Sequence, residues 1–421
     1  MRYIKPDYYD KFQCTADKCP DTCCAGWQIV IDEASLEKYD EMTGSFGNRV
    51  HNSIDWEEGC FFQYEGRCAF LNEQNLCDLQ KQMGEESLCD TCRNYPRHTE
   101  EYEGLRELSL SLSCPAAAEM ILSQQGMPRF VITEDDRGDE LEDEFEDFDL
   151  LLFTQLEDAR KAVFDSLKSE KAPKIESGSH KENGFYQGLD RAQITLQDKM
   201  QKCMEMAEKM QKCVEEGRYF EIEECVRQFC DKQSSTAIEA APNAADAKAY
   251  KTEGVGNDGA GTDPYEQKIS LYRTMKQLER LREEWTDLLS EMERILYDGG
   301  RENYLRIQKD FHAWLEHVPE RKACWENVGL QLFVFFVYTY FCGAVYDDWI
   351  YSKMALAVSS VEFIRELLMA RWKKNGEICF ADYAELSYRY AREIEHSDLN
   401  LNTLEETFME HCCLPGIPPH I

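Results

Sequence analysis

The sequence is poor in positive charge. Its 421 residues include 47 lysines and arginines against 81 aspartates and glutamates, which gives a formal net charge of −34 at pH 7. Proteins that bind nucleic acid neutralise its phosphates with a basic surface, so this composition argues against direct nucleic-acid binding. An acidic membrane surface would repel the chain as well. We therefore expect any macromolecular partner to be basic or neutral.

The first residues lack the apolar run of a secretory signal. The segment MRYIKPDYYDKF carries charged side chains from its second residue onward. We therefore expect a cytoplasmic protein. Thiols stay reduced in the cytoplasm, so clustered cysteines there indicate metal ligands or catalytic groups rather than a disulfide framework.

Only one internal run approaches the length of a membrane span. Residues 328–346 read VGLQLFVFFVYTYFCGAVY, against the roughly 20 apolar residues that a spanning helix needs. Gln331, Thr339 and three tyrosines interrupt the run, acidic residues flank it, and basic anchoring residues are sparse. The sequence therefore predicts a buried apolar helix and no membrane span.

Residues 231–265 lack the context of a nucleotide-binding loop. They are rich in Ala, Gly, Ser, Thr, Asn and Asp, and include the run Gly254-Val-Gly-Asn-Asp-Gly-Ala-Gly. A glycine-rich phosphate loop follows a strand and opens a βαβ unit, and the pattern predicts neither here. We expect this segment to be a flexible connection between helices.

Cysteine, in contrast, is abundant and unevenly placed. Ten of the 19 cysteines fall within the first 114 residues, where an even spread would place about five. Turn-forming residues surround them, and the clearest periodic stretch is a short helix predicted to begin after Asp32, a good N-cap, and to run through Tyr39. We predict an irregular, cysteine-rich, metal-binding N-terminal head over residues 1–116.

The remainder of the chain has helical periodicity. Leu105, Leu108, Leu112, Ala116 and Met120 recur near a period of 3.6, and later stretches read the same way. The predicted fold is therefore mainly α, with the head attached to a large all-α body. Its expected parts are a helical region at 117–230, the flexible connection at 231–265, and a helical body at 266–421 that contains the buried apolar helix 328–346. Helices are predicted at 141–170, 189–230, 266–297, 301–317, 324–346, 348–374, 380–396 and 401–413.

The spacing of the head cysteines is typical of metal ligands. Two thiols separated by a tight turn can share one centre, and several such pairs occur here. Four thiolates suit either a tetrahedral zinc or a cubane iron–sulfur cluster. Only Cys89-x2-Cys92 fits a zinc knuckle, so a [4Fe–4S] cluster is favoured and zinc is the alternative. The candidate ligands are Cys14, Cys19, Cys23, Cys24, Cys68, Cys77, Cys89 and Cys92.

The adjacent pair Cys23-Cys24 constrains this set. Neighbouring side chains diverge in an extended or turn backbone, so either one of the two is a structural thiol or the head holds two centres. The spacing Cys19-x3-Cys23 followed at once by Cys24 also differs from the x3, x2 loop of enzymes that cleave S-adenosylmethionine reductively.

Several segments together resemble the flagellin lysine-N-methylase (FliB) family. They are Phe12-Gln-Cys14, the run from Cys19 through Cys23-Cys24-Ala-Gly-Trp27 to Asp32, Cys68-Ala-Phe-Leu with Cys77, Cys92-Arg-Asn-Tyr-Pro96, and Tyr390-Ala-Arg-Glu-Ile-Glu-His396. The head also resembles the wider CxxCxxCC family of zinc- or iron-chelating domains, although its Cys19-x3-Cys23 spacing departs from the x2 spacings there.

The FliB resemblance implies an enzyme that transfers the methyl group of S-adenosylmethionine to surface lysines of flagellin and carries a [4Fe–4S] cluster. Such a transfer needs a neutral amine, whose free pKa is about 10.4, so an acidic or tyrosine side chain is expected to accept a proton. The sequence singles out no catalytic residue and no S-adenosylmethionine site. His396 lies in a family-like stretch, but a hydrogen-bonded structural histidine at a helix end is the favoured interpretation.

Two other functions are compatible with the same residues. The chain could be a non-catalytic zinc- or iron-chelating protein whose helical body docks a protein partner. It could also be an electron-transfer protein, although no second cofactor motif accompanies the cysteines.

Overall fold

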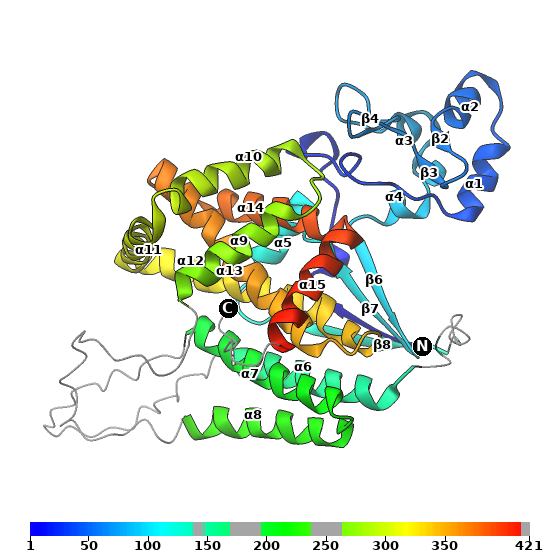
Figure 1. Ribbon diagram of the computed structural model, residues 1–421. Helices are drawn as coiled ribbons and strands as arrows, with labels where there is room; N and C mark the ends of the chain where they lie inside the picture. The colour runs from blue at the N-terminus through cyan, green and yellow to red at the C-terminus, as the bar shows by residue number, and fades with distance from the viewer. Residues whose placement is uncertain (137, 139–144, 146–147, 169–194, 237–262, 414–421) are drawn as a thin grey trace, which may run out of the picture.

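Two hydrophobic cores of unequal size organise the protein in the computed structural model. The large core gathers side chains from Tyr8 to Phe408. The small core gathers side chains between Ile29 and Cys89, including the buried thiols of Cys68 and Cys89. In Figure 1 the segments of the small core project from one end of the helical body. The structure describes residues 1–136, 138, 145, 148–168, 195–236 and 263–413.

The predicted head of residues 1–116 is divided between these two cores. Tyr8 and Phe12 at its start, and Tyr102 and Leu112 near its end, all belong to the large core. The cysteine-rich middle of the head forms the small core. The chain therefore begins in the body, leaves it to form the small core, and returns.

A four-stranded sheet anchors both ends of this excursion, in the strand order β6-β7-β1-β8. The central strand β1 (Arg2–Pro6) runs parallel to β7 (Leu105–Leu110) and antiparallel to β8 (Phe130–Glu134). The strand β6 (Arg97–Tyr102) is antiparallel to β7. Because β1 pairs with strands about 100 residues away in sequence, the sheet closes the base of the head.

The sheet corrects the prediction that the chain turns helical after residue 104. Leu105 and Leu108 lie on a strand, and β8 lies inside the region 117–230 that was expected to be helical. Most of β7 is buried, so its apolar residues do not alternate with polar ones as they do on a half-exposed strand. The ion-paired Glu107 sits among them and leaves leucines at a spacing that imitates a helix.

The head itself contains short elements, and the predicted helix after Asp32 is confirmed. Asp32 caps α1 by accepting a hydrogen bond from the backbone N–H of Ser35 at 2.9 Å. Two small hairpins supply the remaining strands. The elements are α1 (Glu33–Asp40), α2 (Gly44–His51), β2 (Ile54–Asp55), β3 (Cys60–Phe61), β4 (Gln63–Tyr64), β5 (Arg67–Cys68), α3 (Asp78–Met83) and α4 (Asp90–Asn94).

The body is helical, as predicted, and most of its helices overlap the predicted ranges, although many of their ends differ by a few residues and the predicted stretches 189–230 and 266–297 each contain two helices. The helices are α5 (Pro115–Leu122), α6 (Leu150–Leu167), α7 (Leu196–Glu215), α8 (Ile222–Thr236), α9 (Pro264–Gln277), α10 (Glu283–Met292), α11 (Gly300–His317), α12 (Pro319–Tyr340), α13 (Ile350–Asn375), α14 (Phe380–Glu395) and α15 (Asp398–Cys413). The chain is thus mainly α.

Helices α12 and α13 lie at the centre of the body. They pack against each other, and α13 also contacts α7, α14 and α15. The segment Pro319–Val345 has the length and composition of a membrane span, but 83% of its most apolar window is buried inside the protein. The hydroxyl of Tyr338 on α12 donates to the carbonyl of Ile4 at 2.9 Å, which ties the helix to the sheet. This agrees with the predicted buried helix at 328–346.

The predicted connection at 231–265 is helical at its start. Residues 231–236 continue α8, and Asp263 caps α9 by accepting from the backbone N–H of Tyr265. Residues 237–262, with the glycine-rich run, lie outside the described residues.

Candidate functional site

Five of the eight predicted ligand thiols lie in or against the small core. Cys68 and Cys89 are part of it, and Cys24, Cys77 and Cys92 pack against it. Local structure places them. Cys68 ends β5, Cys77 and Cys89 occupy the N-caps of α3 and α4, and Cys92 lies within α4. Four separate segments therefore bring their thiols to one small region.

These thiols lie close enough to perturb one another. Burial raises the pKa of Cys68 to about 11, and repulsion by the thiolates of Cys77, Cys89 and Cys23 adds to the rise. A hydrogen bond from the thiol of Cys92 lowers the pKa of Cys89, and donating it raises the pKa of Cys92. Within the Cys89-x2-Cys92 pair, Cys89 is therefore the first to become a thiolate.

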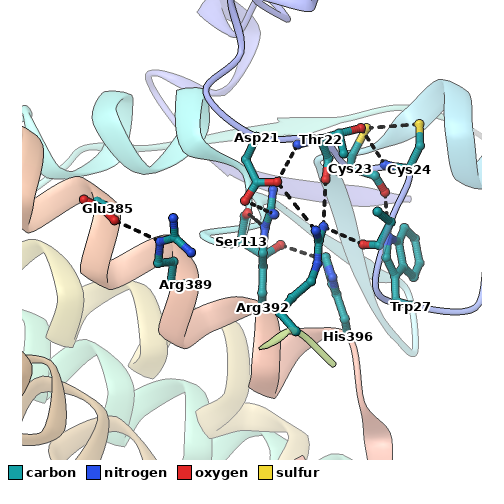
Figure 2. Close-up of polar contacts among 12 residues, drawn as sticks. Asp21, Thr22, Cys23, Cys24, Trp27, Ser113, Glu385, Arg389, Arg392 and His396 are labelled. Atoms are coloured by element: carbon teal, nitrogen blue, oxygen red, sulfur yellow. Dashed lines mark hydrogen bonds and ion pairs between the residues drawn. The ribbon is translucent and has the colours of Figure 1, made fainter. Parts of the chain in front are cut away.

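The side chains of Cys23 and Cys24 were predicted to diverge, and this prediction is wrong. Their sulfurs lie 3.9 Å apart (Figure 2). The backbone turns tightly here, because the N–H of Cys24 donates to the Thr22 hydroxyl at 3.1 Å and Trp27 Nε1 donates to the carbonyl of Cys23 at 2.7 Å. The adjacency of the two cysteines therefore does not by itself require two centres.

The structure also links Cys19 and Cys114 to this region. Burial raises the pKa of Cys19, and repulsion by Cys23 contributes. Cys114, at the N-cap of α5, was not among the predicted ligands. Burial raises its pKa to about 12, with contributions from Cys19 and Cys23. The sequence feature that could have drawn attention to Cys114 is its position directly before Pro115, which opens a helix. Cys14 is exposed, and its sulfur accepts from the N–H of Ala16 at 3.4 Å.

The thiols lie in one region, but their positions do not have the geometry of a metal site. Across the described parts of the chain, no three His, Cys, Asp or Glu side chains converge closely enough to hold a metal ion. The donor set nevertheless fits a soft metal centre in its chemistry, because thiols from several segments share one partly buried region. Seven of the eight predicted ligands are therefore neighbours, Cys14 being the exception, and the contacts among the described residues favour neither zinc nor iron–sulfur.

The body reaches this region through the end of α14. Arg392 forms an ion pair with Asp21, and its Nε donates to the carbonyl of Ser113 at 2.9 Å (Figure 2). The rings of Trp27 and His396 stack with centroids 4.6 Å apart. The family-like stretch 390–396 thus meets the family-like cysteine segment directly. We call residues 21–27 the cysteine turn.

His396 has the surroundings of a structural histidine. It is the C-cap of α14, and its Nε2 lies 2.9 Å from the Ser113 hydroxyl. Burial lowers its pKa to about 3, with help from Arg392 and Arg282. The imidazole is therefore neutral at pH 7 and a weak base, which agrees with the interpretation favoured from the sequence.

Glu393 is a more suitable acid–base group, and the sequence did not single it out. Its side chain is 1% exposed, and one oxygen accepts from the backbone N–H of Leu281 at 3.0 Å. The other oxygen, Oε1, is buried and finds no hydrogen-bond partner within the described structure. Burial raises the pKa of Glu393 to about 7. Only tertiary packing makes this glutamate unusual among the many acids of the chain.

A second buried carboxyl lies between α11 and α13. Glu366 accepts from the hydroxyls of Tyr304 at 2.9 Å and Tyr297 at 3.1 Å. Burial raises its pKa. Glu366 and both tyrosines are buried in the interior of the body.

The fold and the thiol-rich region define a mainly α protein with a cysteine-based head, and comparison with known proteins identifies its family. Residues 185–413, more than half of the chain, match the FliB lysine N-methylase C-terminal domain. The chain therefore belongs to the FliB lysine N-methylase family.

Named relatives agree with this assignment. The chain is 30% identical over 128 residues to a lysine-N-methylase of Salmonella typhimurium, covering 28% of this chain and 32% of that protein. The same identity and length relate it to the flagellar biosynthetic protein FliU of Salmonella muenchen, of which 76% is covered. The match thus spans about a third of the length of the lysine-N-methylase. No solved structure matches the chain.

Proposed function

We propose that the protein is an S-adenosylmethionine-dependent protein lysine N-methyltransferase that acts on surface lysines of flagellin. Membership of the FliB lysine N-methylase family is the observation that carries this proposal. The direct packing of the matched domain on the cysteine turn supports it, because the two family-like regions form one structural unit. A net charge of −34 suits a lysine-bearing protein substrate. A cytoplasmic location follows from the proposal and stays a prediction.

The proposal includes a [4Fe–4S] cluster in the head, with zinc as the alternative. Four thiolates would hold such a centre, and the candidates are Cys23, Cys24, Cys68, Cys77, Cys89 and Cys92, with Cys19 and Cys114 beside them. Such a centre would cross-link the segments of the small core and fix the position of the cysteine turn.

The chain's own residues can account for the proton that the reaction releases. The substrate lysine must lose its proton before its nitrogen attacks the methyl group. One carboxylate oxygen of Glu393 has no hydrogen-bond partner among the described residues, and its pKa of about 7 is close to neutral pH, where a proton acceptor with such a pKa is most effective. Nearby Arg280 and Arg282 also disfavour a charged amine there. We assign Glu393 as the candidate proton acceptor.

The experiment that tests the methyltransferase proposal uses full-length protein prepared without oxygen. It is mixed with flagellin and S-adenosylmethionine labelled in its methyl group, and the label on lysine is located by mass spectrometry. Label on flagellin lysines supports the proposal. If flagellin carries no label although the protein binds S-adenosylmethionine and retains its metal, the proposed methyltransferase activity is wrong.

Metal content tests the cofactor separately. About four irons per chain with a broad visible absorption band would support the cluster. Stoichiometric zinc would contradict the cluster and support the zinc centre instead. Serine replacement of Cys68, Cys77, Cys89 or Cys92 should abolish metal retention. Replacement of Cys203, which is fully buried on α7 and apart from the head, is the matched control and should not.

One observation favours the non-catalytic alternative. Cys68 and Cys89 are part of the small core, as expected for ligands of a purely structural metal. In that case the body would dock a partner and no methyl transfer would occur, so the labelling experiment separates the two functions.

A further inference from the structure

The cysteine turn is held from outside the head by Arg282. This residue is the N-cap of α10, and its Nη2 donates to the carbonyl of Ala25 at 2.7 Å and to that of Thr22 at 3.1 Å. Its Nη1 lies 3.7 Å from Asp21. A single guanidinium therefore contacts the turn on both sides of Cys23 and Cys24.

Arg392 completes the hold from the second body element. It forms an ion pair with Asp21 (Figure 2). Because Nη1 of Arg282 lies 3.7 Å from the same side chain, this carboxylate contacts two guanidinium groups. Asp21 also accepts a hydrogen bond from the backbone N–H of Thr22 at 2.7 Å, so the two arginines fix the start of the turn through this carboxylate.

The contact at Gly26 is close enough to dictate the residue type. Gly26 has a φ of +85°, and a Cβ built there would lie 2.3 Å from Nε of Arg282. A side chain at this position would strain the backbone and displace the guanidinium. The cysteine turn and Arg282 are thus fitted to each other.

Both guanidinium groups approach the turn from poorly solvated positions. The side chain of Arg392 is 4% exposed and that of Arg282 is 20% exposed. Asp21 lies near both groups, and Glu393 is a second carboxyl near Arg282. Positive charge in a poorly solvated place is costly unless anions compensate it, and a negatively charged metal–thiolate centre at the turn would add to this compensation.

From these contacts we propose that Arg282 and Arg392 are positioning residues for the metal-binding thiols of the cysteine turn. They orient Cys23 and Cys24 toward the small core and offset the negative charge of the ligands. Both lie in the region that matches the FliB lysine N-methylase C-terminal domain, whereas the turn lies outside it, so one part of the chain controls the ligand geometry of the other. This inference rests on the proposed metal centre.

The test uses the full-length protein with Arg282→Gln and Arg392→Gln. Arg389→Gln is the matched control, because Arg389 lies one turn earlier on α14 and pairs with Glu385 at 3.0 Å instead (Figure 2). Metal loss to a chelator and the hydrogen exchange of residues 21–27 are both measured. Outer groups that orient metal ligands commonly change metal affinity about 10- to 100-fold. We expect metal loss to accelerate at least about tenfold in both variants, faster exchange in the turn, and no change in the control.

The outcomes separate this inference from the proposed function. If hydrogen exchange of residues 21–27 in the two variants is as slow as in the wild type, the positioning role is overturned, whether or not metal is present. Faster exchange with unchanged metal loss overturns the link to the ligands. If the wild-type protein binds no metal, the proposed metal centre is overturned. Faster exchange in the variants would then support only a role of the two arginines in stabilising the conformation of the turn. Arg282→Lys, which keeps the charge but not the paired hydrogen bonds, should fall between wild type and Arg282→Gln.

Discussion

Burial changes the ionisation of single side chains at the end of α14, and their positions decide what each can do. His396 and Glu393 lie three residues apart, yet burial lowers the pKa of the histidine to about 3 and raises that of the glutamate to about 7. The histidine is therefore neutral and structural at pH 7. The glutamate is poised to exchange a proton, because burial disfavours its charge and one oxygen lacks a partner within the described structure.

The raised pKa of Glu393 predicts a pH-dependent stability. In the folded state this pKa lies above 4.5, the ordinary value of a glutamate, so the contribution of the carboxyl to stability is fully present below pH 4.5 and is lost as the pH rises through about 7. The loss is on the order of 3 kcal/mol. Glu393→Gln should remove this dependence. Urea unfolding between pH 4.5 and about pH 8.5 measures it.

An exposed glutamate provides the control for that experiment. Glu283→Gln, at the start of α10, should keep the wild-type pH profile. Parallel profiles for wild type and Glu393→Gln would contradict the assigned ionisation of Glu393.

At the scale of elements, the sheet is joined to the helical body by a buried ion pair. Both terminal nitrogens of Arg160 on α6 contact the carboxylate of Glu107 on β7, and Nη1 also donates to the carbonyl of Tyr338 at 3.2 Å. Glu107 is 1% exposed and Arg160 is 5% exposed. The pair is therefore desolvated, and either member alone would be a buried charge without a counterion.

This arrangement predicts a marked asymmetry between single and double substitution. Glu107→Gln should lower the free energy of unfolding by about 3–5 kcal/mol, because it leaves Arg160 uncompensated. The double variant Glu107→Gln with Arg160→Met should recover part of that loss. A double-mutant cycle in urea tests this, and additive effects of the two changes would contradict it.

The elements that the sequence predicted are those with local signals. Asp32 marks the start of α1 through its own side chain, and amphipathic helices such as α10, α11 and α14 carry their period within the sequence itself. The strand β7 was missed because its pairing with β1 and the partner of Glu107 come from distant residues. Burial on both faces removed the alternation that would have shown a strand.

At the scale of the whole molecule, the protein combines a large core with a small one that contains few buried residues. The large core extends over helices from α5 to α15 and over the sheet. The small core is formed by short elements and thiols. Cores of this size are marginal without a metal or another cross-link. We therefore expect the head to depend on the proposed metal centre, and the body to be stable without it.

Metal removal should therefore unfold only part of the chain. We expect a chelator to expose residues 28–92 to limited proteolysis while the helical signal in circular dichroism is largely retained. Fragment masses identify the cleavage sites, and metal added back should restore protection. Simultaneous loss of head and body in one transition would contradict independent stability of the large core.

The sequence by itself determined the mainly α character, the cysteine-rich head and the family resemblance, because these depend on local period, composition and short motifs. Only the tertiary structure decided that the head is divided between two cores and that Cys114 lies near Cys19 and Cys23, two of the candidate ligands. It also decided that Arg282 holds the cysteine turn and that one buried oxygen of Glu393 has no hydrogen-bond partner among the described residues. Each of these features depends on packing between residues far apart in the chain, and their burial and charge follow from neighbours that no local pattern specifies.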